Sequence, residues 1–446
     1  MTVATPPPRP PHRRRPRVRV PAGRSIHFRL THRARRRHLR RGTLLALLAV
    51  MGPGLLAGLS DDDPAGITTY SVLGADYGYR LLWVLALSTA ALVVFHELAA
   101  RTGVVTGKGL ITLVRERYGR RATAVALGAL VVANVGTLCA EFAGIAAGMQ
   151  LLTGAGRELT VPVFAFVISA LVLRSSFHRV EHVLLALSSV FIAYILAGVL
   201  AHPDWGATAR GLVVPDLPLT RRAVLDAVAT VGTTLAPWGL AFMQSYAVDK
   251  RLTVADLKYE RLDVAAGAIM TGVIGLFIVV ACAATLHVHG VRVEDAGDAA
   301  SALGPLVGDF ATTLFGLGIV GAAVLAAAIV PLSTAYSVAE GLDRPSGLDL
   351  SLREAPAFYG AYGAAMAVAA GLVLLPGVPL VPVLVLSQAL NAVLLLLVLP
   401  FLRALAADPE VMGDHRLTRT GRGVTAAVIA AVAAAVLALG ILTLGA

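Results

Sequence analysis

Three consecutive aspartates, Asp61 to Asp63, separate two apolar stretches at 44–59 and 67–73. Neither stretch is long enough to cross a bilayer alone, because a spanning helix needs about 20 residues. A charge in the hydrocarbon costs roughly 2.5–3.5 kcal/mol on insertion scales, so acidic residues there usually face a protein interior or a water-filled path. Pro64 removes a backbone donor, and Gly66 tolerates non-helical dihedral angles. The sequence therefore predicts a membrane helix that unwinds at Pro64 and Gly66, where carboxylates and freed carbonyls form a cation site. The alternative is a short acidic loop outside the membrane.

Apolar stretches of membrane length dominate the rest of the chain. Of its 446 residues, 57% are hydrophobic and 15% are charged, a balance that excludes a soluble globular protein. We predict an all-α polytopic membrane protein of about eleven spanning helices. They are expected at 44–73, 81–100, 123–152, 159–173, 181–201, 222–248, 262–287, 306–339, 356–375, 380–402 and 423–444, the first and sixth being broken. The two cysteines, Cys139 and Cys282, lie in apolar segments, so neither a disulfide framework nor a cysteine metal site is expected.

A second proline and glycine interrupt the sixth apolar stretch, in the run from Thr233 to Gly239. The two broken helices are five spans apart, and an odd number of spans per unit inverts the second unit. Interrupted helices at corresponding positions of two inverted halves indicate the midplane site of a transporter. We predict a LeuT-like core at 44–402, with inverted repeats at 44–201 and 222–402. The segment 403–446 then holds a loop and an accessory eleventh helix.

Residues 1–43 form a proline-rich, basic segment without an acidic residue. We predict a disordered cytoplasmic tail that contacts anionic lipid. Nucleic-acid binding is the alternative reading, but no folded nucleic-acid-binding motif follows the tail, so no nucleic-acid partner is expected. A cytoplasmic N terminus also places two basic connections on the positive inner side of the plasma membrane. These connections contain Arg101, Lys108, Arg115, Arg117, Arg120, Arg121, Lys250, Arg251, Lys258 and Arg261.

A few polar residues stand within the predicted spans. Glu141, Gln388 and Asn391 are costly in lipid and are expected to face the protein interior, the last two on one helical face. For Gln388 and Asn391, hydrogen bonding between helices is an equally good interpretation. Glu97 and Arg101 are four residues apart and predict a structural ion pair rather than part of a site.

Several short motifs together resemble one transporter family. Gly52-Pro53-Gly54 followed by Asp63-Pro64-Ala65-Gly66 is similar to its helix-1 signature, 98–108 and 115–119 match the stretch after helix 2, and Leu386-Ser387-Gln388 matches the start of helix 10. On these residues the chain from Gly52 to Leu402 resembles the Nramp family of divalent-metal transporters. The resemblance implies a membrane transporter and not an enzyme, with the metal as cargo and no cofactor.

The departures from the Nramp pattern indicate a particular branch of that family. The family has Asn where this chain has Gly66, and Met-Pro-His-Asn where this chain has Ala236-Pro237-Trp238-Gly239. A methionine thioether favours soft transition metals, whereas Mg²⁺ prefers oxygen ligands and retained water. These departures resemble the Nramp-related magnesium transporters. Leu138 and Met243 stand at the family's proton-route Asp and His, which leaves only Glu141 of that route.

We therefore expect import of Mg²⁺, with Mn²⁺ also accepted, by alternating access and without proton coupling. The resemblance assigns the metal to Asp63, Gly66, Thr233, Ala236 and Gln388, with Asp61, Asp62, Glu141 and Asn391 as possible auxiliaries. The alternatives are a proton-coupled Mn²⁺/Fe²⁺ importer of the ordinary Nramp type and an amino-acid symporter of the same fold. Three aspartates at the first break oppose the carboxylate of an amino acid. An enzyme is a further class, but no nucleophile and base constellation supports it.

Overall fold

The computed structural model describes residues 62–174, 191–293, 296–301, 308, 311–348 and 350–444. The predicted tail at 1–43, the first half of the first broken helix and Asp61 lie outside these residues. So does 181–190, the start of the predicted fifth span. The predicted repeat boundaries therefore stay predictions at these points.

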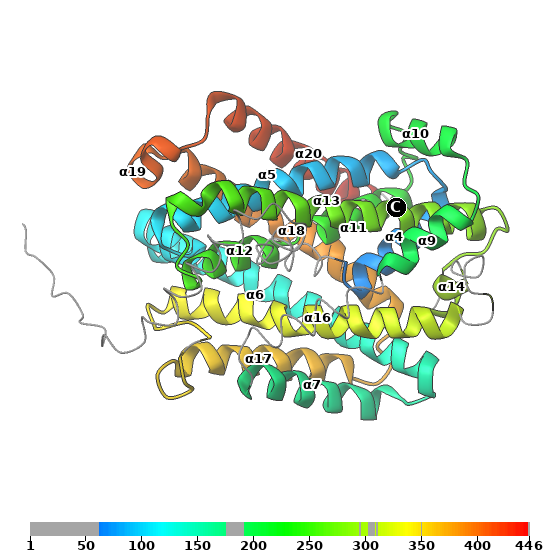
Figure 1. Ribbon diagram of the computed structural model, residues 1–446, viewed down its shortest axis with the longest axis horizontal. Helices are drawn as coiled ribbons and strands as arrows, with labels where there is room; N and C mark the ends of the chain where they lie inside the picture. Colours follow the sequence, from blue (N-terminus) through cyan, green and yellow to red (C-terminus); the bar gives the residue numbers. More distant parts are fainter. Residues whose placement is uncertain are drawn as a thin grey trace, which may run out of the picture. The chain divides into compact units, whose positions relative to one another are not determined.

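Helices make up the regular structure of the described residues (Figure 1). They are α4 (Pro64–Tyr77), α5 (Leu82–Thr106), α6 (Leu110–Thr153), α7 (Arg157–Arg174), α9 (Phe191–Leu200), α10 (Trp205–Val213), α11 (Arg221–Thr234), α12 (Pro237–Asp249), α13 (Leu257–Cys282), α14 (Ala296–Ser301), α16 (Ala311–Gly341), α17 (Pro356–Val373), α18 (Leu380–Ala407), α19 (Pro409–Met412) and α20 (Arg419–Leu444). Each of the eleven predicted spans has a helix at its place in the described chain. The all-α prediction is confirmed.

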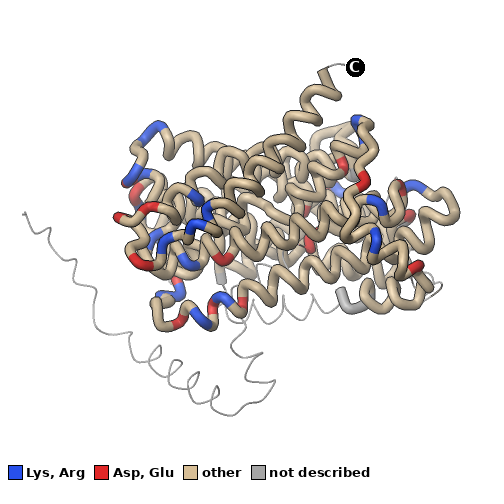
Figure 2. The backbone as a smooth tube through the Cα atoms, turned by 90° about the horizontal axis from the view of Figure 1, so that it is seen from above, with Lys and Arg blue, Asp and Glu red and all other residues tan. Residues whose placement is uncertain are grey.

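Eight of these helical segments are long and apolar enough to cross a membrane, within the described ranges. The segment Arg221–Asp249 is one of them and consists of α11 and α12, so the sixth predicted span is broken where the sequence places the break. The spans at the other predicted positions correspond to α4, α7 and α9. Charged residues gather at the two ends of the helices and leave the middle mostly free of charge, as membrane spans require (Figure 2).

Several helical segments were not expected from the apolar pattern, among them the start of α6, the short helix α10, α14 and α19. The first turns of α6 fall in a stretch that reads as a basic connection, and the helix kinks at Gly119, whose φ is 78°. Leu110, Ile111 and Val114 are buried there, so this part is amphipathic and its exposed face carries the charges. The short helix α10 is capped by Asp204, whose carboxylate accepts the Ala207 N–H at 2.9 Å. The start of α6 and the helix α10 both lack the continuous apolar run that indicates a span.

The core is closely packed around α6, which contacts α4, α16, α17 and α18. Small residues allow this close approach, as they do in other membrane helices. Both cysteines are buried and free, as the sequence predicts. The predicted ion pair between Glu97 and Arg101 is present at 3.3 Å, and Glu97 also accepts from Arg261 Nε at 2.7 Å.

Gly103 sits where α5 crosses α12. A Cβ at this position would lie 2.5 Å from the backbone oxygen of Gln244. We expect Gly103→Ala to lower the free energy of unfolding by about 1–3 kcal/mol, because the two helices must separate to admit the methyl group. Thermal unfolding of the purified protein measures this.

Gly128, in α6, is the matched control, because a Cβ there would meet no atom within 4 Å. Gly128→Ala is expected to be neutral or to stabilise by about 0.5–1 kcal/mol, since alanine favours a helix interior. Equal effects of the two substitutions would contradict close packing at Gly103.

Candidate metal site at the two helix breaks

Asp63 caps the N terminus of α4. Its backbone is extended, with φ −75° and ψ 171°, and its carboxylate accepts the Gly66 N–H at 2.6 Å. Pro64 occupies the first helical position, where a missing N–H costs nothing. The helix therefore resumes at Pro64, and the prediction that Gly66 is unwound is wrong, because Gly66 is already in the first turn. Asp63 is only 3% exposed, and Asp62 beside it is fully buried, so the first break carries charge into the protein interior.

Glu141, from the middle of α6, meets Asp63. The two carboxyl groups interact electrostatically, and neither carboxylate oxygen of Glu141 has a hydrogen-bond partner among the described residues. Close packing holds this arrangement, because Gly144 of α6 lies against the ring of Pro64. Glu141 is fully buried, which confirms the predicted interior position. Two adjacent buried carboxylates repel each other, and a divalent cation relieves that repulsion.

The second break comprises Leu235 and Ala236, between α11 and α12. Pro237 has no N–H, so the carbonyl of Thr233 lacks the donor that would continue the helix. The Thr233 hydroxyl is buried and has no hydrogen-bond partner among the described residues. Ala236 is extended, with φ −71° and ψ 137°, and is 2% exposed. This break thus leaves oxygen atoms without helical partners in the interior.

Gln388 and Asn391 lie on one face of α18, fully buried. The Asn391 Nδ2 donates to Gln388 Oε1 and to Thr137 Oγ1 of α6, each at 2.9 Å. Hydrogen bonding between helices is therefore confirmed for Asn391. The Gln388 oxygen keeps a second lone pair for a ligand. Asn391 Oδ1 has no partner within the described chain.

Contacts between the helices bring these residues together (Figure 1). Ala65 of α4, Ala140 of α6 and Leu384 of α18 belong to one small buried cluster. Gly232, beside Thr233, faces the carbonyl of Gln388 so closely that a Cβ would not fit. The beginning of α4, the end of α11 and the middle of α6 and α18 thus meet in one buried region. Within the described residues, no group of three or more His, Cys, Asp or Glu side chains could hold a metal. A cation here would therefore rely on one or two carboxylates and on neutral oxygens.

The first half of the broken sixth helix is fastened to α4. Tyr70 and Thr234 share a hydroxyl hydrogen bond of 3.0 Å. Two further interactions join these helices. Tyr77 Oη donates a hydrogen bond to Asp226 Oδ2 at 2.7 Å, and Arg222 forms an ion pair with Asp76 at 2.7 Å. These contacts extend along both helices, so α11 and α4 form one unit.

The second half, α12, is fastened to α16 instead. Ser333 donates to the Trp238 carbonyl at 2.9 Å, and Tyr336 donates to Asp249 at 2.8 Å. Near the end of α16, the Glu340 carboxylate accepts from Ser245 of α12 at 2.6 Å.

Glu340 also binds the start of α6. Its carboxylate accepts the N–H groups of Ile111 and Thr112 at 3.1 and 3.3 Å. The sequence did not single out Glu340, because a carboxylate at the end of an apolar helix is normally expected to face solvent. The only available signal was a glutamate that follows a long uncharged run in α16.

Comparison with known proteins follows from this architecture. The family model described as natural resistance-associated macrophage protein-like, Nramp, matches residues 54–442. The divalent metal cation transporter MntH of Yersinia enterocolitica is 30% identical over 379 residues, which cover 82% of this chain and 88% of that protein. The chain belongs to the Nramp family. The resemblance drawn from the motifs is thereby confirmed, as is the expectation of a transporter rather than an enzyme.

Solved structures agree with the Nramp fold. A manganese transporter of Eremococcus coleocola superposes with a TM-score of 0.69 at 19% identity, covering 88% of this chain and 86% of that chain. MhsT, solved with L-phenylalanine, gives a TM-score of 0.53 at 16% identity over 88% of this chain and 98% of that one. The LeuT-like fold prediction for this Nramp chain is confirmed. Membership of the Nramp family decides against the amino-acid symporter alternative.

Proposed function

We propose that this divalent metal cation transporter of the Nramp type carries Mg²⁺ as its preferred ion, accepts Mn²⁺, and works by alternating access without proton coupling. One observation carries the choice of ion: the second helix break presents Ala236, with no thioether, in a buried region where the hydroxyl of nearby Thr233 has no hydrogen-bond partner among the described residues. Mg²⁺ takes oxygen ligands and keeps several waters, and it gains nothing from sulfur. The metal is cargo, so no cofactor is needed.

We propose a set of ligands from the residues at the two helix breaks and on α18. The Asp63 carboxylate supplies the charge, the carbonyls around Thr233 and Ala236 and the Gln388 amide oxygen supply neutral donors, and water completes the shell. Gly66 acts indirectly, because its N–H holds the Asp63 carboxylate at 2.6 Å. Glu141 and Asp62 contribute charge nearby, and Asn391 holds Gln388 in place. We also propose Asp61 as an auxiliary to the metal ligands.

A proton-coupled Mn²⁺ or Fe²⁺ importer is the second candidate. The contact between the Asp63 and Glu141 carboxyl groups favours it, because two adjacent buried carboxyls can share a proton until a cation displaces it. Against it stand Leu138 and Met243, both fully buried, which cannot carry a proton away from this pair.

The protein is a multi-pass integral membrane protein. We place it in the plasma membrane with a cytoplasmic N terminus, and we assign the basic tail at 1–43 to anionic lipid. The support for this orientation is the crowding of Lys and Arg in the connections named above.

Ala236→Met tests the proposed ion preference. We expect the ratio of Mn²⁺ to Mg²⁺ uptake to rise about tenfold, equal to about 1.4 kcal/mol of binding free energy, because a thioether is restored at the second break. Competition uptake into proteoliposomes that contain the purified protein measures the ratio, and Cd²⁺ serves as a softer probe.

The control is Ala90→Met, which adds the same side chain at an exposed position of α5. It is expected to leave the ratio unchanged. If Ala236→Met also leaves the ratio unchanged, Ala236 does not line the cation path.

A further inference from the structure

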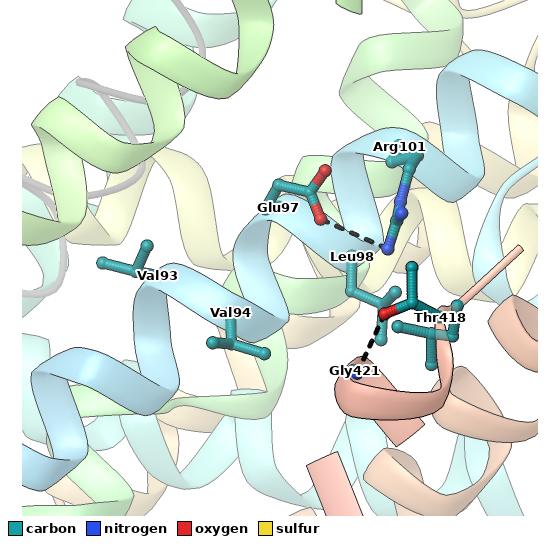
Figure 3. A pocket seen from close by; sticks show the side chains of 8 residues that line it. Val93, Val94, Glu97, Leu98, Arg101, Thr418 and Gly421 are labelled. Atoms are coloured by element: carbon teal, nitrogen blue, oxygen red, sulfur yellow. Dashed lines mark hydrogen bonds and ion pairs between the residues drawn. The ribbon is translucent and has the colours of Figure 1, made fainter. Parts of the chain in front are cut away.

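A groove of about 290 Å³ lies between α5 and the beginning of α20 (Figure 3). One wall is apolar and consists of Val93, Val94, Leu98 and Leu417. Arg101 and Thr418 stand at its polar end, where Figure 3 shows the Arg101 guanidinium beside Glu97. The groove is remote from the two helix breaks in sequence and shares no residue with the candidate metal site.

The position of Arg101 along α5 sets the depth of this groove in a bilayer. Arg101 follows Leu82, the first residue of α5, by 19 positions, or about 28 Å at 1.5 Å per residue. The hydrocarbon core is about 30 Å thick, so Arg101 falls at one boundary when Leu82 lies at the other. Val94 then lies about 10 Å inside that boundary. The groove therefore runs from the headgroup level into the acyl region.

Most of the α20 helix, which begins at the groove, is not covered by protein in the described chain. Only 6% of the apolar window of α20 is buried, the smallest share among the eight candidate spans of the described chain. α20 contacts mainly α11 and α18, and touches α5 less. A lipid chain is the apolar material that surrounds such a helix.

The polar end has excess positive charge. Arg101 and Arg261 share the single carboxylate of Glu97, at 3.3 and 2.7 Å. The Arg101 Nε is buried and has no hydrogen-bond partner within the described residues. Arg419 and Arg422 add two exposed charges in the first turn of α20. A phosphate matches this charge.

We propose that the groove binds one anionic glycerophospholipid of the bilayer, with its phosphate at Arg101 and the start of α20 and one acyl chain along Val93, Val94, Leu98 and Leu417. The bound lipid fills the gap between α5 and α20 and holds the accessory helix against the transporter core. This inference does not depend on which metal is carried.

Native mass spectrometry of the purified full chain tests the proposal. Phosphatidylglycerol and phosphatidylcholine with identical acyl chains are compared at equal concentration. We expect one phosphatidylglycerol to be retained per chain at least about fivefold better than phosphatidylcholine, since one arginine near a membrane surface contributes about that factor. Arg101→Gln is expected to remove the preference, whereas Arg353→Gln, which removes an exposed charge elsewhere, keeps it.

A second variant tests the apolar part. Val94→Trp fills the groove and is expected to release the bound lipid, while Val132→Trp, at a half-exposed position of α6, retains it. Equal retention of the two lipids by the unmodified protein, or full retention in Val94→Trp, overturns the proposal even if Arg101→Gln does not fold. Inorganic phosphate and glycerol 3-phosphate distinguish the source: displacement of the lipid by either at millimolar concentration would make this a soluble-anion site.

Discussion

Replacing Asp63 with Asn is expected to reduce divalent-metal uptake at least about 100-fold while the protein stays folded. Removing one partner of a buried charge interaction typically costs about 3–5 kcal/mol, which corresponds to more than two orders of magnitude in binding. The Asn side chain keeps an oxygen that can accept the Gly66 N–H, so the cap of α4 survives. Uptake of Mg²⁺ and Mn²⁺ into proteoliposomes and thermal unfolding are measured on the same preparation.

Asp204→Asn provides a matched control, because Asp204 also caps a helix and accepts the Ala207 N–H at 2.9 Å, but it is exposed. It is expected to change neither uptake nor unfolding appreciably. Undiminished uptake of either metal by Asp63→Asn would remove Asp63 from the ligand set.

Metal uptake is expected to proceed without stoichiometric proton movement. A proton relay needs titratable groups within hydrogen-bond reach of one another along a route through the membrane. Glu141 and Asp63 interact electrostatically, but the buried Leu138 and Met243 offer no continuation from this pair. The membrane potential then drives entry of the cation. Proteoliposomes loaded with a pH indicator and held at a negative internal potential report metal and proton entry together, and vesicles without metal give the passive leak.

Constant internal pH during Mg²⁺ or Mn²⁺ entry is the expected result. Acidification above the leak that disappears in Asp62→Asn or Glu141→Gln would establish the coupled importer instead. The two variants also separate the possible proton carriers, since Asp62 belongs to the first break and Glu141 to α6.

The break in the sixth predicted span could be predicted from its proline and glycine. Pro237 lacks the N–H that would bond the Thr233 carbonyl, and the break lies where the sequence places it, whereas Pro162, Pro331 and Pro400 stand inside continuous helices. The conformation of Gly66 could not be obtained in this way. Glycine permits an unwound backbone without requiring one, and the carboxylate of Asp63 decides the matter by capping the helix three residues earlier.

Contacts between residues on different helices could not be predicted from the sequence. Glu141 has no titratable neighbour in its own part of α6, and its contact with Asp63 depends on the close crossing at Gly144. Asn391 shows the same limit: its spacing from Gln388 predicts a shared face, but only packing reveals that Thr137 of α6 receives its second hydrogen bond.

The second break joins two helical arms, α11 and α12, which are attached to different helices of the core. One arm is hydrogen-bonded to α4 through Tyr70 and Thr234, while the other is hydrogen-bonded to α16 through Ser333 and Glu340. Of the proposed ligand groups, Thr233 lies in the last turn of α11 and Ala236 lies between the two arms, so a change in the angle between the arms would change the coordination polyhedron itself. With the ligands proposed above, no signal from the cation to a distant gate would be needed, because the ligands themselves would shift when the arms do.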